Sequence, residues 1–325
     1  MRVTPAVIVG ALVALLGAAE ASAGNGGFAP VPPESPNAQG ITSSFWFVSL
    51  FCLGIFLLVQ GLLIAFVIRY RRRKRPRDLD GAQIHGSTRL ELAWTAFPVV
   101  ILFAILAFIF AKLPGIQDVP AATAGQENLV IDVTGTQFTW YFRYPNGVVA
   151  IDRMRAPEGQ TVELHVTAPD WDVIHSWWIP ALGGKIDAIP GRLNKTWFRA
   201  ERSGVFRGQC AELCGIYHAK MLADVEVMPP DEFEAWLDER GTQQAAGTSP
   251  LGEELWDGTC AKCHGAEGEG GYGPRIAGSD LLTDEAAITR LLREGGPKLM
   301  PPVGRDWNAA EVEALTAYLK ENLGG

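Results

Sequence analysis

Two long apolar runs dominate the hydrophobic pattern of the first third of the chain. Residues 44–68 contain no charged side chain, and residues 92–113 contain one lysine. At a rise of about 1.5 Å per residue, each run is long enough to cross the ~30 Å hydrocarbon core of a bilayer as a helix. The short polar stretch between them, residues 78–89, predicts a transmembrane helix hairpin over residues 44–114.

The segments that flank these runs predict their orientation. Seven of the nine residues from Arg69 to Arg77 are basic, and basic flanks remain in the cytoplasm. Residues 1–23 have the charged start, apolar run and A-x-A site of a signal peptide, although an additional membrane helix is the alternative. Residues 24–43, rich in Pro, Gly and Asn, then form a mobile exported arm. We therefore expect a bacterial inner-membrane protein with both termini and all residues after Pro114 on the extracytoplasmic side.

The hydrophobic period changes to two in the middle of the chain. Ile131 and Val133 alternate with polar residues, and a similar run begins at Val162. Short strands separated by Gly, Pro and Asn turns predict a Greek-key β-sandwich or barrel over residues 115–230.

The last quarter of the chain has a helical pattern with little strand signal. Residues 231–250 form a linker between domains: residues 231–240 are acidic and predict a short helix, and residues 241–250, rich in Gln, Ala, Gly and Thr, are typical of a flexible segment. Residues 251–325 then form a separate, small helical domain.

Composition narrows the classes of partner and site. The formal net charge of −8 argues against a nucleic-acid partner, and the hydrophobic content of 48% agrees with membrane helices. Of the five cysteines, Cys52 lies in an apolar run and the others form two pairs within motifs. We therefore expect no structural disulfide.

The first motif is a run of metal-binding residue types from Cys210 to Met221. Cys214 follows four residues after Cys210, and then come His218 and Met221. Thiolates, imidazoles and thioethers are soft or borderline ligands that favour copper over magnesium or calcium. Two thiolates at this spacing suit two copper ions bridged by both sulfurs, and His175 upstream supplies a second imidazole. The alternatives are a disulfide, which leaves His218 and Met221 unexplained, and a structural zinc site, whose usual ligand spacing differs.

The second motif, C-x-x-C-H at Cys260, Cys263 and His264, is the attachment motif for c-type heme. Two thioethers fix the porphyrin, and the histidine binds the iron from one side. Met300 is the only methionine after Met228, so it is the predicted second axial ligand, which favours a raised potential. A redox dithiol and a zinc site are the alternatives.

The loop from Cys210 to Met221 resembles the dinuclear copper (CuA) loop of cytochrome c oxidase subunit II, C-x-E-x-C-x3-H-x2-M, at every ligand position. Residues 44–227 resemble that subunit, and residues 251–325 resemble a class I cytochrome c, as in a caa-type terminal oxidase. The resemblance implies a multidomain fold: a two-helix transmembrane hairpin, a cupredoxin-like Greek-key β-barrel and a small all-α cytochrome c domain. It implies that electrons pass from heme c to the copper pair and on to subunit I, which reduces O2 to water and pumps protons.

The resemblance also implies roles for single residues. Glu212 would bind copper through its backbone carbonyl, and its carboxylate would reach a magnesium ion shared with subunit I. Glu91 would lie at the mouth of a proton pathway. The family pattern G-x-Q-W-Y-W is replaced here by a sequence with Phe138 and Trp140, so the tryptophan that usually accepts electrons is a phenylalanine. This departure agrees with delivery from the tethered heme domain, with Trp140 on the electron path. The implied partners are oxidase subunits I and III, membrane lipid, and a cytochrome or quinol-oxidising complex as donor.

Three other functions remain open from the sequence. The chain could be the subunit through which electrons enter a copper-containing nitric oxide reductase, which would share this architecture. It could be a quinol oxidase subunit, but those lack the copper ligands. It could also be a membrane-tethered copper or thiol-redox protein without a catalytic partner, whose thiols would exchange freely.

Overall fold

The structure is a computed structural model that describes residues 29–71, 83, 85–122, 127–247, 250–297 and 300–324. It divides into two compact units: one covers Gly40–Ile116, and the other joins the residues before it to everything from Gln117 onward. The predicted signal peptide, residues 1–23, lies outside the described residues.

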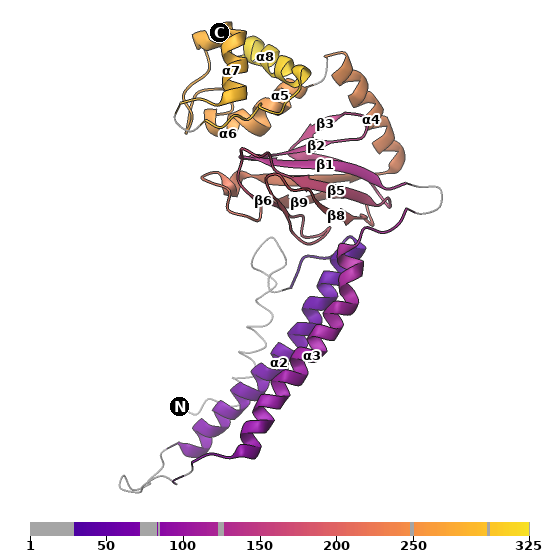
Figure 1. Cartoon of the computed structure of the whole chain (residues 1–325), viewed down its shortest axis with the longest axis vertical. Helices are drawn as coiled ribbons and strands as arrows, with labels where there is room; N and C mark the ends of the chain where they lie inside the picture. The colour runs from indigo at the N-terminus through magenta and orange to yellow at the C-terminus, as the bar shows by residue number, and fades with distance from the viewer. Residues whose placement is uncertain are drawn as a thin grey trace, which may run out of the picture. The chain divides into compact units, whose positions relative to one another are not determined.

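Two long helices, α2 (Pro36–Tyr70) and α3 (Thr88–Gln117), make up the first unit and run side by side in Figure 1. The rings of Phe47 and Phe108 stack between them with centroids 4.0 Å apart. Both helices are long and apolar enough to cross a membrane, in agreement with the predicted hairpin. Each helix extends several residues beyond the apolar run that predicted it.

The start of α2 differs from the mobile arm that we expected. Ser35, Asn37 and Ala38 are buried in the second unit. The side-chain amide of Asn37 donates to the carbonyl of Trp197, 2.5 Å away. Pro36 begins the helix, where the missing N–H of proline carries no cost. The expectation of a mobile arm is therefore wrong for these residues.

A β-sheet domain follows the helices (Figure 1). Its larger sheet has the order β3-β2-β1-β5-β8, in which β1 and β5 are parallel. The strands of this sheet are β1 (Leu129–Thr136), β2 (Thr139–Arg143), β3 (Val149–Ile151), β5 (Val162–Thr167) and β8 (Asn194–Phe198). The remaining strands form a sheet β4-β10-β9 and a pair β6-β7: β4 (Arg153–Pro157), β10 (Leu222–Met228), β9 (Gly204–Gln209), β6 (His175–Trp177) and β7 (Ile186–Ala188).

The predicted alternation forms the core of this domain. Ile131 and Leu164 of the larger sheet lie in one buried cluster with Phe206 and Val225 of the three-stranded sheet. Along β5, every second residue is buried. Apolar side chains on the facing sides of the two sheets therefore hold the sandwich together, and the predicted β domain is confirmed.

Helix α4 (Pro230–Ala245) contains the short helix expected over residues 231–240 and extends to Ala245, into the segment that we expected to be flexible. Phe233 is buried in the β-domain core. The ring of Trp236 packs 5.3 Å from that of Tyr144 and lies 4.9 Å under the guanidinium of Arg155. These contacts stabilise a helix that is longer than the sequence predicted.

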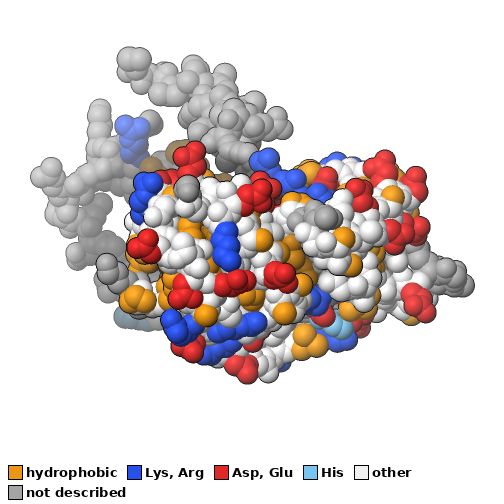
Figure 2. Space-filling view, turned by 90° about the horizontal axis from the view of Figure 1, so that it is seen from above, with side chains coloured by type: hydrophobic (Ala, Val, Ile, Leu, Met, Phe, Trp, Pro, Cys, Tyr) orange, Lys and Arg blue, Asp and Glu red, His pale blue; other side chains and the backbone are white. Residues whose placement is uncertain are grey.

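The C-terminal region is helical, as predicted. Its elements are α5 (Leu251–Leu255), a π-helical turn η3 (Trp256–Cys260), α6 (Ala261–His264), η4 (Asp280–Thr283), α7 (Glu285–Glu294) and α8 (Ala309–Leu323). Helices α5 and α8 cross at Gly252, where a Cβ atom would lie only 2.2 Å from the carbonyl oxygen of Ala314. Figure 2, which views the molecule from above, shows both acidic and basic side chains on this face.

Candidate functional site

The loop between β9 and β10 is closed by backbone hydrogen bonds. Cys210 N–H donates to the carbonyl of Met221 at 2.9 Å, so the two ends of the loop continue the pairing of the strands. Ala211 N–H donates to the carbonyl of Ser176 at 2.9 Å, which ties the loop to β6. Because His175 begins β6, these bonds place it beside the loop.

The side chains predicted to bind copper converge at this loop. The ligand atoms of His175, Cys210 and Cys214 all lie within 4.8 Å of one another, and all three residues are buried. The two sulfurs are 3.9 Å apart, which excludes a disulfide between them in this structure. The sulfur of Cys214 lies 3.6 Å from His218 Nδ1 and 3.8 Å from the sulfur of Met221.

His175 shows that the site fits a metal ion. Its ring is fully buried, and neither ring nitrogen has a hydrogen-bond partner among the described residues. The nearest carboxylate oxygen belongs to Asp172, 3.5 Å from Nε2. Buried polar atoms without partners are rare and point to an ion or another ligand. The carbonyl oxygen of Glu212 lies 3.2 Å from the sulfur of Cys210, so this oxygen also faces the cluster.

Electrostatics favours a soft cation in this cluster. The hydrogen bond between the two thiols lowers the pKa of Cys210 to about 3 and raises the pKa of Cys214. The two sulfurs therefore share one proton and carry one negative charge at neutral pH. Burial by itself lowers the pKa of His175, but the neighbouring Asp172 and Cys210 outweigh it and raise that pKa. A thiolate already in place is the form that binds copper.

The aromatic residues near the cluster lie in two different places. Trp140 is fully buried, and its ring packs against His175 and Trp177 with centroids 6.2 Å and 5.3 Å away. Phe138 instead packs edge-on against Tyr217, 5.7 Å away, and lines a second cavity. Of Trp140 and Phe138, Phe138 is therefore the one that faces the helical domain.

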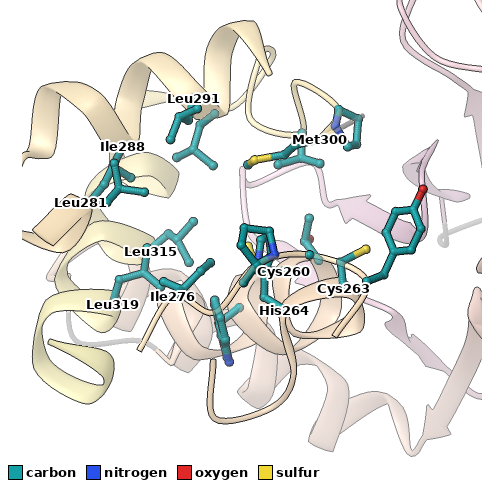
Figure 3. Close-up of a pocket in the computed structure, with 18 of the residues that line it drawn as sticks. Cys260, Cys263, His264, Ile276, Leu281, Ile288, Leu291, Met300, Leu315 and Leu319 are labelled. Carbon is teal, nitrogen blue, oxygen red and sulfur yellow. The ribbon is translucent and has the colours of Figure 1, made fainter. Parts of the chain in front are cut away.

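The second cavity, of about 630 Å³, contains the whole predicted heme motif (Figure 3). Its volume is in the range of cofactor sites. Cys260, Cys263 and His264 line one side, and Met300 lies across the cavity from His264. An aliphatic wall completes the cavity and consists of Ile276, Leu281, Ile288, Leu291, Leu315 and Leu319.

His264 is oriented as an axial ligand requires. Its Nδ1 lies 2.8 Å from the carbonyl oxygen of Pro274. A carbonyl only accepts, so Nδ1 carries the proton, and Nε2 keeps its lone pair for iron. Gly273 makes room for the ring, because a Cβ atom there would lie 2.6 Å from His264 Cε1. The cavity and its ligands therefore fit a covalently attached heme.

The cysteines of this cavity do not resemble a redox dithiol. Burial raises the pKa of Cys260 to about 12 and also raises the pKa of Cys263. Reactive dithiols have a depressed pKa, because the thiolate is the nucleophile. The apolar surroundings agree better with heme attachment than with thiol exchange.

Glu91 lies in the first turn of α3. Its carboxylate accepts a hydrogen bond from Ser87 N–H at 3.2 Å, and its side chain is exposed. The contact is typical of a helix start. This arrangement does not test a role of Glu91 in proton transfer, so that role stays a prediction.

Sequence reasoning missed the residues that the β domain contributes to the heme cavity. Gln137, Gly215 and Ile216 line it together with Phe138. It also missed Lys262, whose ammonium group donates to the carbonyl of Phe138 at 2.8 Å. The residues around a lysine between two cysteines do not indicate whether its side chain is buried against another domain or solvated.

Three family models match successive parts of the chain. The transmembrane domain of cytochrome c oxidase subunit II matches residues 27–111, and its periplasmic domain matches residues 146–228. The model described as cytochrome c oxidase, cbb3-type, subunit III matches residues 249–319. The matches follow the order of the two-helix unit, the β domain and the helical domain.

Individual relatives agree with these models. Cytochrome c oxidase subunit 2 of Alkalihalophilus pseudofirmus is 33% identical over 316 residues, which cover 89% of each chain. The Cereibacter sphaeroides subunit 2 is 34% identical over 266 residues, 69% of this chain and 84% of that relative. The crystal structure of the periplasmic domain of subunit II of cytochrome oxidase (CoxB) of Bradyrhizobium japonicum is 37% identical, covering 38% of this chain and 98% of that one, with a TM-score of 0.35. This chain therefore belongs to the cytochrome c oxidase subunit II family, as the subunit through which electrons enter a heme–copper oxidase, with a fused cytochrome c domain.

Proposed function

We propose that this subunit accepts electrons at a heme c and delivers them through a dinuclear copper site to subunit I, which reduces O2 to water and pumps protons. When bound, the heme and the copper pair supply one-electron redox chemistry that no side chain provides. The main support for this proposal is that one chain holds both a buried cluster of sulfur and imidazole ligands and a cavity with a C-x-x-C-H motif and a methionine.

At the copper site, Cys210 and Cys214 would hold the copper pair through their thiolates. His175 and His218 would bind through ring nitrogens, and Met221 would bind through its sulfur. The carbonyl of Glu212 is the sixth contributor, and its carboxylate is the candidate ligand of a magnesium ion shared with subunit I. Support comes from the convergence of these groups on a loop held between paired strands, which limits ligand movement between charge states.

In the heme domain, Cys260 and Cys263 would attach the heme as thioethers. His264 would bind the iron through Nε2 and Met300 through its sulfur, a ligand pair that favours a raised potential. The aliphatic wall excludes water from the cofactor. Support comes from the hydrogen bond that fixes the His264 tautomer and from the placement of Met300 across the cavity.

The family match establishes a membrane protein with two transmembrane helices and a periplasmic domain. We extend this to a bacterial inner membrane with both termini outside, a β domain at residues 115–230 and a heme domain at 251–325. Subunits I and III, lipid, and a cytochrome or quinol-oxidising donor are the proposed partners. Glu91 is proposed at the mouth of a proton pathway, and Trp140 on the electron path because its ring packs against His175.

Spectroscopy of the purified oxidase complex tests the two sites. We expect a mixed-valence two-copper EPR signal and a low-spin heme spectrum. Cys214→Ser should abolish the copper signal and O2 turnover while leaving the heme spectrum unchanged. Cys52→Ser is the matched control, because that thiol lies exposed on α2 and should change neither. Mononuclear copper in the unmodified protein contradicts the proposal, and faster reduction of NO than of O2 indicates the nitric oxide reductase instead.

A further inference from the structure

We propose that Lys262 latches the heme domain (residues 251–324) onto the copper domain (residues 127–230), so that electrons cross from one fixed docked geometry. This inference rests on the proposed function of the two sites and adds the residues that hold them together. Both domains belong to the same compact unit. The alternative is a heme domain that searches for the copper site on its tether.

Lys262 makes both of its hydrogen bonds to the other domain. It lies between the two cysteines of the heme motif, yet its ammonium group donates to the carboxylate of Asp152 at 2.5 Å and to the carbonyl of Phe138 at 2.8 Å. Its side chain is only 15% exposed. A charge-assisted hydrogen bond that is shielded from water is stronger and less sensitive to salt than a surface ion pair.

The copper domain holds Asp152 ready for this contact. One carboxylate oxygen of Asp152 accepts hydrogen bonds from the hydroxyl of Thr139 at 2.7 Å and from Trp140 N–H at 3.0 Å. The other oxygen is thereby directed at Lys262. Asp152 also has a φ of 55°, in the left-handed region, which a residue other than glycine keeps only where its surroundings demand it.

The surface around the latch is tightly packed. The hydroxyl groups of Tyr141 and Thr259 lie 2.8 Å apart and are buried between the domains. A Cβ atom on Gly258 would lie 2.3 Å from Ile151 Cγ2, so the heme-domain backbone rests directly on β3. Tyr141 and Ile151 share one apolar cluster with Trp256 of the heme domain. Such an interface shields the ion pair partly from water: the Lys262 side chain is 15% exposed and that of Asp152 is 30% exposed.

The latch directs the heme cavity at the copper loop. Cys263 follows Lys262 directly, and the cavity wall is completed by Phe138 and Ile216 of the copper domain. The ring of Tyr272 in the heme domain lies edge-on, 5.9 Å from that of Tyr217, the residue before the copper ligand His218. The docked arrangement therefore brings the heme cavity against residues that directly precede a copper ligand.

Electron transfer within the purified oxidase complex tests the latch. After photoreduction of the heme, we measure the rate of copper reduction as a function of viscosity. Lys262→Met keeps the length of the side chain and removes its charge. We expect copper reduction to be slower by about tenfold or more and to slow further as viscosity rises. The reason is that removing one partner of this partly buried ion pair lets the heme domain leave its docked position. The unmodified complex should show no viscosity dependence.

Lys320→Met is the matched control. It breaks an ion pair of 3.0 Å with Glu285 that lies wholly within the heme domain. Its transfer rate should equal that of the unmodified complex. Asp152→Asn removes the negative charge of the same ion pair, on the side of the copper domain. This variant tests the latch if the Lys262 variant fails to attach heme. The double variant should be no slower than either single variant, because both remove one interaction.

Hydrogen exchange of the same complexes gives a readout that does not depend on turnover. Peptides containing Ile151 or Thr259 should exchange faster in Lys262→Met than in Lys320→Met, because undocking exposes them. Unchanged exchange and an unchanged transfer rate in Lys262→Met overturn the latch while the proposed function stands. Failure of the reduced heme to reduce copper in the unmodified complex overturns the proposed function itself.

Discussion

Gly273 lies so close to the His264 ring that a single added methyl group would displace the predicted iron ligand. In Gly273→Ala, the new Cβ would lie 2.6 Å from Cε1 and 2.7 Å from Nδ1. The ring must move, which weakens its hydrogen bond to Pro274 and its bond to iron. We expect a shifted reduction potential and a partly high-spin heme, measured by redox titration and EPR.

Gly278→Ala separates this effect from a general loss of stability. Gly278 has a φ of +71°, and no heavy atom of the described residues lies within 4 Å of the place that a Cβ atom would take. Alanine there should lower the free energy of unfolding by about 1–2 kcal/mol through backbone strain alone. Its heme spectrum should remain that of the unmodified protein. An unchanged potential in Gly273→Ala contradicts the proposed packing of the ligand.

The shared proton of Cys210 and Cys214 predicts the pH dependence of copper binding. Cys210 is already a thiolate above a pKa of about 3, whereas Cys214 keeps its proton because its pKa is raised. Binding of copper by both sulfurs must release that proton, and His175, whose pKa is also raised by Asp172 and Cys210, can add to the release. The apparent affinity should therefore rise with pH, by about tenfold per pH unit for each proton released.

Proton release can be measured by titrating copper into the apo complex in a weakly buffered solution at pH 7. We expect at least one proton per copper pair. Cys214→Ser removes the thiol that holds this proton, so its release should be smaller. Copper uptake without any release contradicts the shared-proton arrangement.

At the scale of elements, the crossing of α5 and α8 depends on Gly252. A Cβ atom there would meet the backbone oxygen of Ala314 at 2.2 Å, and backbone cannot rotate away as a side chain can. Gly252→Ala should therefore separate the two helices and destabilise the heme domain by about 1–3 kcal/mol. Thermal melting followed by heme absorbance measures this loss. Gly61→Ala on α2, where φ is not positive and an added Cβ would meet no heavy atom of the described residues, should not lower the melting temperature of the heme domain.

The sequence predicted those elements whose signal is local. The alternation around Ile131 and the ligand spacing after Cys210 both depend on near neighbours in the chain, and the structure places them as expected. The extension of α4 beyond residue 240 was missed, because it depends on distant contacts such as the hydrogen bonds of Gln244 with the backbone of Val149. The burial of Asn37 likewise depends on a carbonyl 160 residues away, at Trp197. Long-range contacts of this kind leave no periodic pattern.

At the scale of the whole molecule, the apolar cluster shared by the heme and copper domains predicts cooperative unfolding. Ile151 of β3 belongs to the same buried cluster as Leu255 and Trp256 of the heme domain. Neither domain can unfold without exposing apolar surface of the other. Melting curves followed separately by heme and copper absorbance should therefore coincide in the unmodified complex.

Two core substitutions distinguish cooperative unfolding from a coincidence of melting temperatures. Ile131→Ala removes a fully buried side chain of the copper domain alone, so both curves should shift down together by several degrees. Ile151→Ala removes packing between the domains at a cost of about 2–5 kcal/mol, so the heme curve should separate and move to lower temperature. If the heme curve fails to follow the copper curve in Ile131→Ala, the two domains are not thermodynamically coupled, because stability lost in one coupled domain must appear in the melting of the other.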